Sequence, residues 1–158
     1  MKKENPLKIV RDYINYGSNR HMKRRHLKKL LKPLIQQNEP EAILLFSTLP
    51  SRQSDQKMAC ISLEMAKKAA KTGFPPAISH LAEIYYNEGN YAKCYPLYQQ
   101  AADFGEPHAL YVLSAVYKFG LDGFEKDLKL SQEYEECAEK AKKWDFTTGY
   151  NDEYIMYE

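Results

Sequence analysis

The sequence has little glycine, few cysteines and no long apolar run, and each scarcity narrows the kind of protein it encodes. Only 7 of its 158 residues are glycine, whereas a turn-rich all-β fold needs many positions with positive φ. No apolar run approaches the length that spans a bilayer, and none follows the basic residues 2–3 closely enough to form a secretory signal. We therefore expect a soluble, helical protein that stays in the cytoplasm.

Residue types that hold metals or act as nucleophiles are also sparse. The three cysteines, Cys60, Cys94 and Cys137, are odd in number and far apart, which favours small buried side chains over a redox or metal role. The histidines have no metal-ligand or triad spacing; His21 and His26, for example, are five residues apart, which does not place two ligands on one helical face. We therefore expect no metal, no cofactor and no catalytic residues, so that the protein is not an enzyme.

The formal net charge of +2 hides an uneven distribution of charge along the chain. Residues 1–37 hold 11 Lys and Arg against 2 Asp and Glu, whereas residues 122–158 hold 5 against 11. The intervening residues are almost neutral, with 7 against 8. The acidic end attracts the basic end of the same chain, or only keeps the chain soluble, or offers an anionic surface that steers a basic partner.

An internal repeat runs through the middle of the chain. Three segments contain a small residue followed by alanine seven positions later, at residues 62–69, 94–101 and 131–138. The first two segments continue to a second alanine and then to Gly73 and Gly105 at equal offsets. Glycine at that place suits the left-handed residue that ends a helix. Each segment therefore predicts the second helix of a repeated unit.

A second pattern marks the first helix of each unit. Alanine, leucine and tyrosine follow one another at intervals of four in residues 77–85 and again in residues 109–117. Proline precedes both sets, and proline in the first turn followed by regularly spaced apolar residues is typical of a helix start. A weaker version begins at Pro40. The predicted helix pairs span about 40–48 with 55–72, 76–88 with 90–104, and 107–119 with 127–143.

These pairs predict an all-α fold, an α-solenoid of about three helix-turn-helix units. One pair cannot bury its apolar stripe alone, so successive pairs must stack. Alanine and glycine near the ends of the second helices permit close approach, and leucine and tyrosine of the first helices fill the space between pairs. The alanine-rich second helices should therefore nest between neighbouring first helices.

Two further helices precede the repeats. The first spans residues 6–16 and is capped by Asn5, and the second ends at about Lys32 because Pro33 follows. We predict one domain over residues 1–158, with basic N-terminal capping helices at 1–39, repeats at 40–143 and an acidic, aromatic C-terminal cap at 144–158.

The repeat residues resemble the Sel-one-like repeat, the longer relative of the tetratricopeptide repeat. Units of that family carry alanine, leucine, tyrosine and glycine in the first helix, then a lysine-aspartate loop and a double alanine before glycine. The resemblance covers about residues 40–143, although the first unit lacks the tyrosine and the loop, and the third lacks the final glycine. The residues of the third unit that match are Ala109, Leu113, Tyr117, Gly120, Lys126, Asp127 and Ala138.

In repeat stacks of this kind, first-helix residues that face away from the core line a concave surface. We expect that surface, together with the acidic C-terminal region, to bind one dedicated protein partner. Tyrosine and phenylalanine suit such a surface because they offer a large contact area at low entropic cost. The predicted partner-binding residues are Ser79, Glu83, Tyr86, Asn87, His108, Tyr111, Lys118 and Phe119.

The resemblance also implies a more specific role. Proteins that resemble Sel-one-like repeats sometimes serve as immunity proteins that neutralise a cognate bacterial toxin. An acidic patch on a small cytoplasmic chain would suit a basic toxin or nuclease domain.

The basic N-terminal segment supports an alternative function, that of a nucleic-acid or membrane-surface adaptor. Phosphate binding needs clustered positive charge, which Lys23, Arg24, Lys28 and Lys32 could supply from one polar face of a helix. A capping helix with leucines inside and lysines in solvent has the same sequence, and so has a helix that docks on protein. No aromatic residue lies among the charges to stack on bases, which disfavours nucleic acid.

Overall fold

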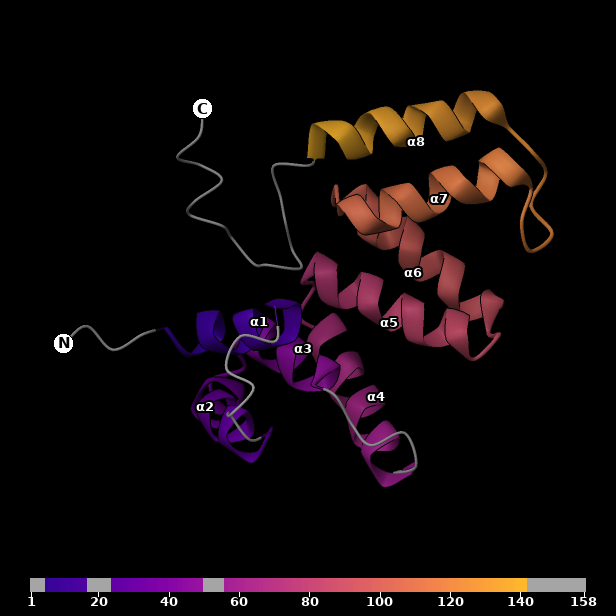
Figure 1. Ribbon diagram of the computed structural model, residues 1–158. Helices are drawn as coiled ribbons and strands as arrows, with labels where there is room; N and C mark the ends of the chain where they lie inside the picture. The colour runs from indigo at the N-terminus through magenta and orange to yellow at the C-terminus, as the bar shows by residue number, and fades with distance from the viewer. Residues whose placement is uncertain (1–4, 17–23, 50–55, 142–158) are drawn as a thin grey trace.

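The computed structural model describes residues 5–16, 24–49 and 56–141, which form eight α-helices and no strand (Figure 1). The all-α prediction is therefore confirmed. Within these ranges, no helix is both long enough and apolar enough to cross a membrane. The helices are α1 (Pro6–Tyr16), α2 (Arg24–Gln36), α3 (Pro40–Thr48), α4 (Gln56–Ala70), α5 (Pro75–Asn87), α6 (Tyr91–Asp103), α7 (Pro107–Phe119) and α8 (Leu128–Ala141).

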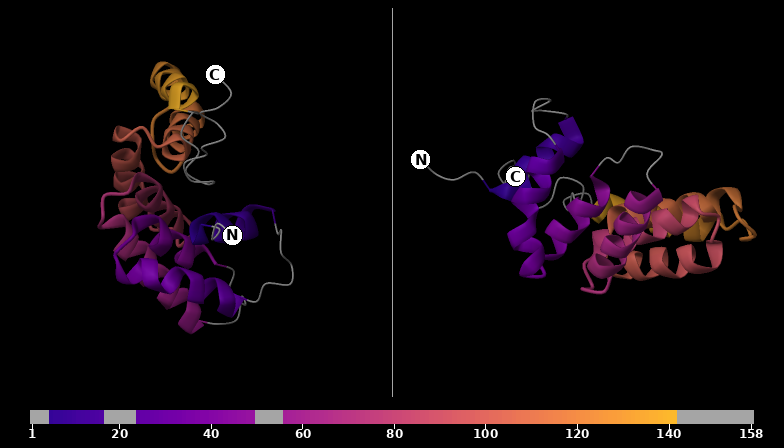
Figure 2. Two further views of the ribbon diagram at one scale, coloured as in Figure 1. Left: turned by 90° about the vertical axis from the view of Figure 1, so that its left-hand side faces the viewer. Right: turned by 90° about the horizontal axis from the view of Figure 1, so that it is seen from below.

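The three predicted helix pairs are present as α3 with α4, α5 with α6, and α7 with α8. Each predicted boundary that falls on described residues lies within two residues of the observed one, and the predicted boundaries at residues 55 and 143 lie outside the described residues. The partners of each pair pack on each other, and α4 and α6 also contact the first helix of the following pair. Figure 2 shows that the stack follows an arc from the N-terminal helices to α8. The predicted C-terminal cap, residues 144–158, lies outside the described residues.

Two glycines end their helices as the repeat pattern predicts. Gly73 has φ of 80° and Gly105 has φ of 75°, a left-handed conformation that disfavours residues with a Cβ atom. The amide of Gly105 donates to the carbonyl of Ala102 at 2.8 Å, and the amide of Glu106 donates to that of Ala101 at 3.1 Å. These bonds satisfy carbonyls that the end of α6 would otherwise leave unpaired, so the chain can turn sharply into α7.

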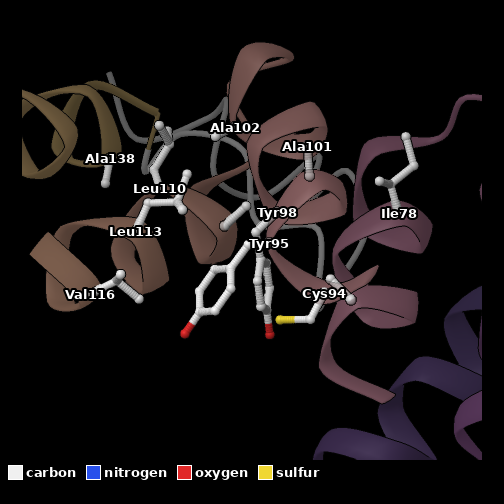
Figure 3. Packing of buried hydrophobic residues seen from close by; sticks show 12 residues of the cluster. Ile78, Cys94, Tyr95, Tyr98, Ala101, Ala102, Leu110, Leu113, Val116 and Ala138 are labelled. Atoms are coloured by element: carbon white, nitrogen blue, oxygen red, sulfur yellow. The ribbon is translucent and has the colours of Figure 1, made fainter. Parts of the chain in front are cut away.

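The repeat alanines lie where the second helices pack on neighbouring helices. Ala69, Ala101 and Ala138, which occupy the same position in the three units, have no exposed surface. Figure 3 shows Ala101 on α6 between Ile78 of α5 and Leu110 of α7, within one buried cluster. Because the alanine side chain is one methyl group, neighbouring helices approach α6 closely at this point. This packing fixes the positions of α5 and α7 relative to each other.

The N-terminal helices pack on the first unit through a separate cluster that includes Leu27 and Leu31 of α2. The prediction that α2 ends at Lys32 is wrong, because the helix continues through Pro33 to Gln36. Proline lacks the N–H that would bond the carbonyl one turn earlier. However, Leu34 and Ile35 pack against the cluster, and their burial favours the additional turn.

The cysteines do not all occupy buried positions as predicted. Cys94 has no exposed surface, whereas Cys60 and Cys137 are exposed. The helical period explains Cys137: Ser131 and Ala138 lie seven residues apart on the buried face of α8, so the residue before Ala138 points outward. Burial raises the pKa of the Cys94 thiol to about 11.

The difference in exposure between Cys94 and the other two cysteines predicts selective alkylation. At pH 8, iodoacetamide should modify Cys60 and Cys137 of the folded protein and leave Cys94 intact, because the thiolate is the reactive form and the buried thiol retains its proton. Mass spectrometry of the alkylated protein should show two adducts, and a third only after unfolding in guanidinium. Modification of Cys94 at the rate of the other two would contradict the packing of α6.

Candidate functional site

The first helices α5 and α7 approach each other at a polar contact, which we call the α5–α7 seam. Ser79 Oγ of α5 lies 3.1 Å from Nδ1 of His108 at the start of α7. Ser79 is only 3% exposed, so the expectation that it belongs to an accessible wall is wrong. The side of α5 that carries Ser79 faces α7, and its hydroxyl holds the His108 ring in place. His108 itself is exposed.

Glu83 lies next along the exposed side of α5. Its Oε2 lies 3.5 Å from Nδ1 of His80, three residues earlier on the same helix. The contact with His80 lowers the pKa of the Glu83 carboxyl, and the charges of His80 and His108 lower it further, against a smaller opposing effect of burial. Glu83 therefore presents a carboxylate beside the α5–α7 seam at neutral pH. Asn87, one turn further on, is exposed.

A groove of about 530 Å³ lies between α7 and α8. Tyr111 of α7 spans one part of the interface, because its hydroxyl donates to Oε1 of Glu139 on α8 at 2.7 Å. Three of the lining residues are exposed glutamates, and Lys118 is the only basic residue among those described that line the groove. The groove is therefore acidic. Its lining residues are Lys118, Leu128, Ser131, Gln132, Glu135, Glu136 and Glu139.

Large apolar side chains are exposed at the ends of the helices that form this groove. Phe119, the last residue of α7, is 65% exposed, and Leu128, the first residue of α8, is 60% exposed. The seam and the groove together form what we call the α5–α7–α8 surface. It consists of Glu83, Asn87, His108, Tyr111, Lys118, Phe119, Leu128, Gln132, Glu135, Glu136 and Glu139.

Tyr86 lies apart from this surface. Its ring centroid is 5.5 Å from that of Tyr91 at the start of α6, so it packs beside the second helix of its own pair. It is 39% exposed. Of the eight predicted residues, Ser79 is thus buried and Tyr86 borders α6, whereas the other six belong to the α5–α7–α8 surface.

A second groove, of about 500 Å³, was not foreseen from the sequence. The sequence pattern assigns Tyr117 to the core and gives Tyr91 no role, yet Tyr91 is 40% exposed. The available signal was Tyr91 and Tyr95 one helical turn apart, followed by Phe124 in the long loop between α7 and α8. We call this the aromatic groove. Its lining residues are Tyr91, Ala92, Tyr95, Pro96, Gln99, Leu113, Tyr117, Asp122 and Phe124.

The basic residues proposed for nucleic-acid binding do not all have one role. Lys28 Nζ lies 5.1 Å from the centroid of the Phe46 ring, where it joins α2 to α3 through a cation–π contact. Lys32 is exposed. Arg24 begins α2, and Lys23 lies outside the described residues. Because Lys28 packs against a ring, it is less available to a phosphate than its sequence position suggests.

In the ranges that the structure describes, no group of three or more His, Cys, Asp or Glu side chains is arranged to hold a metal ion. The groups that line the α5–α7–α8 surface are instead suited to hydrogen bonds and ion pairs with a partner.

Comparison with known proteins bears on the fold. No family model matches the chain, and no curated protein matches its sequence. Among solved structures, the chain is similar to the Sel1 repeat protein from Oxalobacter formigenes, with a TM-score of 0.59 and 20% sequence identity. The match covers 71% of this chain and 88% of that one. The fold is therefore the Sel1-like repeat α-solenoid, as the sequence resemblance predicts.

Proposed function

We propose that this Sel1-like α-solenoid is a non-catalytic module that binds a dedicated protein partner through the α5–α7–α8 surface. The observation that carries the proposal is the acidic groove between α7 and α8, flanked by exposed Phe119 and Leu128. Protein interfaces commonly combine apolar anchors with a polar rim. Here Phe119 and Leu128 provide the anchors, and the glutamates that line the groove provide the rim.

The charge of the groove determines the chemistry of the partner. Glu135 and Glu136 are exposed, and the chain from residue 122 onward holds 11 acidic residues against 5 basic ones. Such a surface attracts a basic protein and accelerates its association. We infer that the partner presents Lys and Arg side chains to α8.

A basic toxin would meet this requirement, and we propose that the protein acts in the cytoplasm as an immunity protein for such a toxin or nuclease domain. Binding would cover the basic surface with which a nuclease holds nucleic acid, because that surface must carry clustered positive charge. Neutralisation then needs no chemistry from this chain, only a complex that dissociates slowly.

Affinity capture tests this proposal. The tagged chain is co-expressed with the product of the adjacent gene and purified, and the complex is measured by calorimetry at micromolar concentrations. We expect a one-to-one complex and protection of the cells from the toxicity of the partner expressed alone. Absence of association at micromolar concentration would rule out the adjacent gene product as the partner. Binding without protection of the cells would contradict the immunity role but would leave the proposed protein-binding function standing.

A further inference from the structure

We propose that the aromatic groove binds an arginine side chain carried by an extended segment of another protein. The groove shares no residue with the α5–α7–α8 surface. The inference therefore goes beyond the function proposed above and does not depend on it.

Four of the nine residues that line the groove are aromatic. The ring of Phe124 packs edge-on against Tyr95, with centroids 4.6 Å apart, and against Tyr117 at 5.6 Å. Tyr91 lies 6.2 Å from Tyr95 and opens to solvent. The faces of such rings attract cations that come within about 6 Å of the centroid. A planar guanidinium also stacks on them, which an ammonium does not do.

The only charged residue among the described residues that line the groove is Asp122. The Tyr95 hydroxyl donates to Oδ2 of its carboxylate, which leaves Oδ1 able to accept from a ligand. The carboxylate is also the largest cause of the raised pKa of Tyr91, so its negative field reaches the exposed ring. A cation at this place would gain both the carboxylate and the exposed ring of Tyr91.

A second acceptor comes from the backbone of α6. Pro96 lies inside the helix and has no N–H, so the carbonyl of Ala92 lacks the donor that an ordinary helical residue would provide. Both residues line the groove. An arginine has five N–H donors in a planar fork, so it has donors enough for the Asp122 carboxylate and for a backbone carbonyl as well.

The length of the groove indicates a peptide segment rather than a small free cation. Its α6 side runs from Tyr91 to Gln99, which is about 12 Å of helix. An extended segment of roughly four residues covers that distance. The negative charge is confined to Asp122 among the lining residues, so one cationic side chain suffices and the flanking residues lie along the rings.

The test uses the full chain and a blocked pentapeptide in which arginine is flanked by alanines. Ring signals of Tyr91, Tyr95, Tyr117 and Phe124 are followed by NMR during titration. We expect saturable shifts at these four rings. The matching citrulline peptide, which has the same shape without the charge, should bind about tenfold or more weakly, as expected for loss of a charge-assisted contact. Equal binding of the two peptides, or no ring shifts at roughly millimolar peptide, would overturn the proposal.

Two protein variants and one smaller ligand complete the test. Asp122→Asn should weaken binding of the arginine peptide about tenfold. The variant should retain the fold, because asparagine tolerates the positive φ of 54° at this position and can accept a hydrogen bond from Tyr95. Glu125→Gln removes the same charge from an exposed residue of the same loop that does not line the groove, and it should leave binding unchanged. Arginine amide alone should bind more weakly than the pentapeptide. Equal affinities for these two ligands would overturn the assignment to a peptide segment.

Discussion

Replacing Ala101 by leucine is expected to lower the free energy of unfolding by about 1–3 kcal/mol, the usual result of forcing extra methylenes into a packed core. Ala101 has no exposed surface and lies between Ile78 and Leu110. The larger side chain has to push α6 away from its neighbours or force them out of their preferred rotamers. In a chain of this size, the midpoint of thermal unfolding should fall by roughly 2–4 °C for each kcal/mol.

The neighbouring residue provides the matched control. Gln100 is exposed on the same helix, so Gln100→Leu should change stability by no more than about 0.5 kcal/mol. Circular dichroism of both variants during heating measures the difference. If Ala101→Leu has the same midpoint of thermal unfolding as the unchanged protein, the second helices do not nest between neighbouring first helices.

Reversing two charges on α8 is expected to slow binding of the protein partner by tenfold or more at low ionic strength, about the size of steering effects in charged interfaces. Glu135→Lys with Glu136→Lys removes two carboxylates from the groove and places two ammonium groups there. The difference from the unchanged protein should shrink as salt is added, because exposed charges are screened. Surface plasmon resonance with the captured partner gives the association rates.

A second double variant separates the local effect from net charge. Glu64→Lys with Asp103→Lys changes the net charge by the same amount at exposed residues that do not line the groove. Its association rate should stay much closer to that of the unchanged protein. Equal slowing by both double variants would mean that overall charge, and not the α7–α8 groove, directs the partner.

The helices were predictable because their signals are local. Gly73 and Gly105 mark the turns because glycine adopts positive φ readily. In each unit, an alanine seven positions after a small residue marks the buried side of the second helix. The end of α2 was predicted wrongly at Pro33 because the prediction used only local signals. The local effect of the proline disfavours a helix, but burial of Leu34 and Ile35 by elements distant in sequence outweighs that effect.

The binding surface was less predictable because it depends on how neighbouring pairs are placed. Position 79 has a polar residue on a first helix, which suggests exposure, yet its side chain is buried and contacts His108 of α7. Tyr86 has the spacing of a surface residue, but the adjacent start of α6 brings Tyr91 against it. The aromatic groove combines α6, α7 and a loop. Its residues are therefore brought together only by the tertiary fold.

Hydrogen exchange of the complex with its partner tests the central claim most directly. We predict that binding slows amide exchange at the exposed ends of α7 and α8 and in the last turns of α5, and leaves α1 and α2 unchanged. Protection confined to α2, with none along α7 and α8, would contradict the assignment of partner binding to the α5–α7–α8 surface.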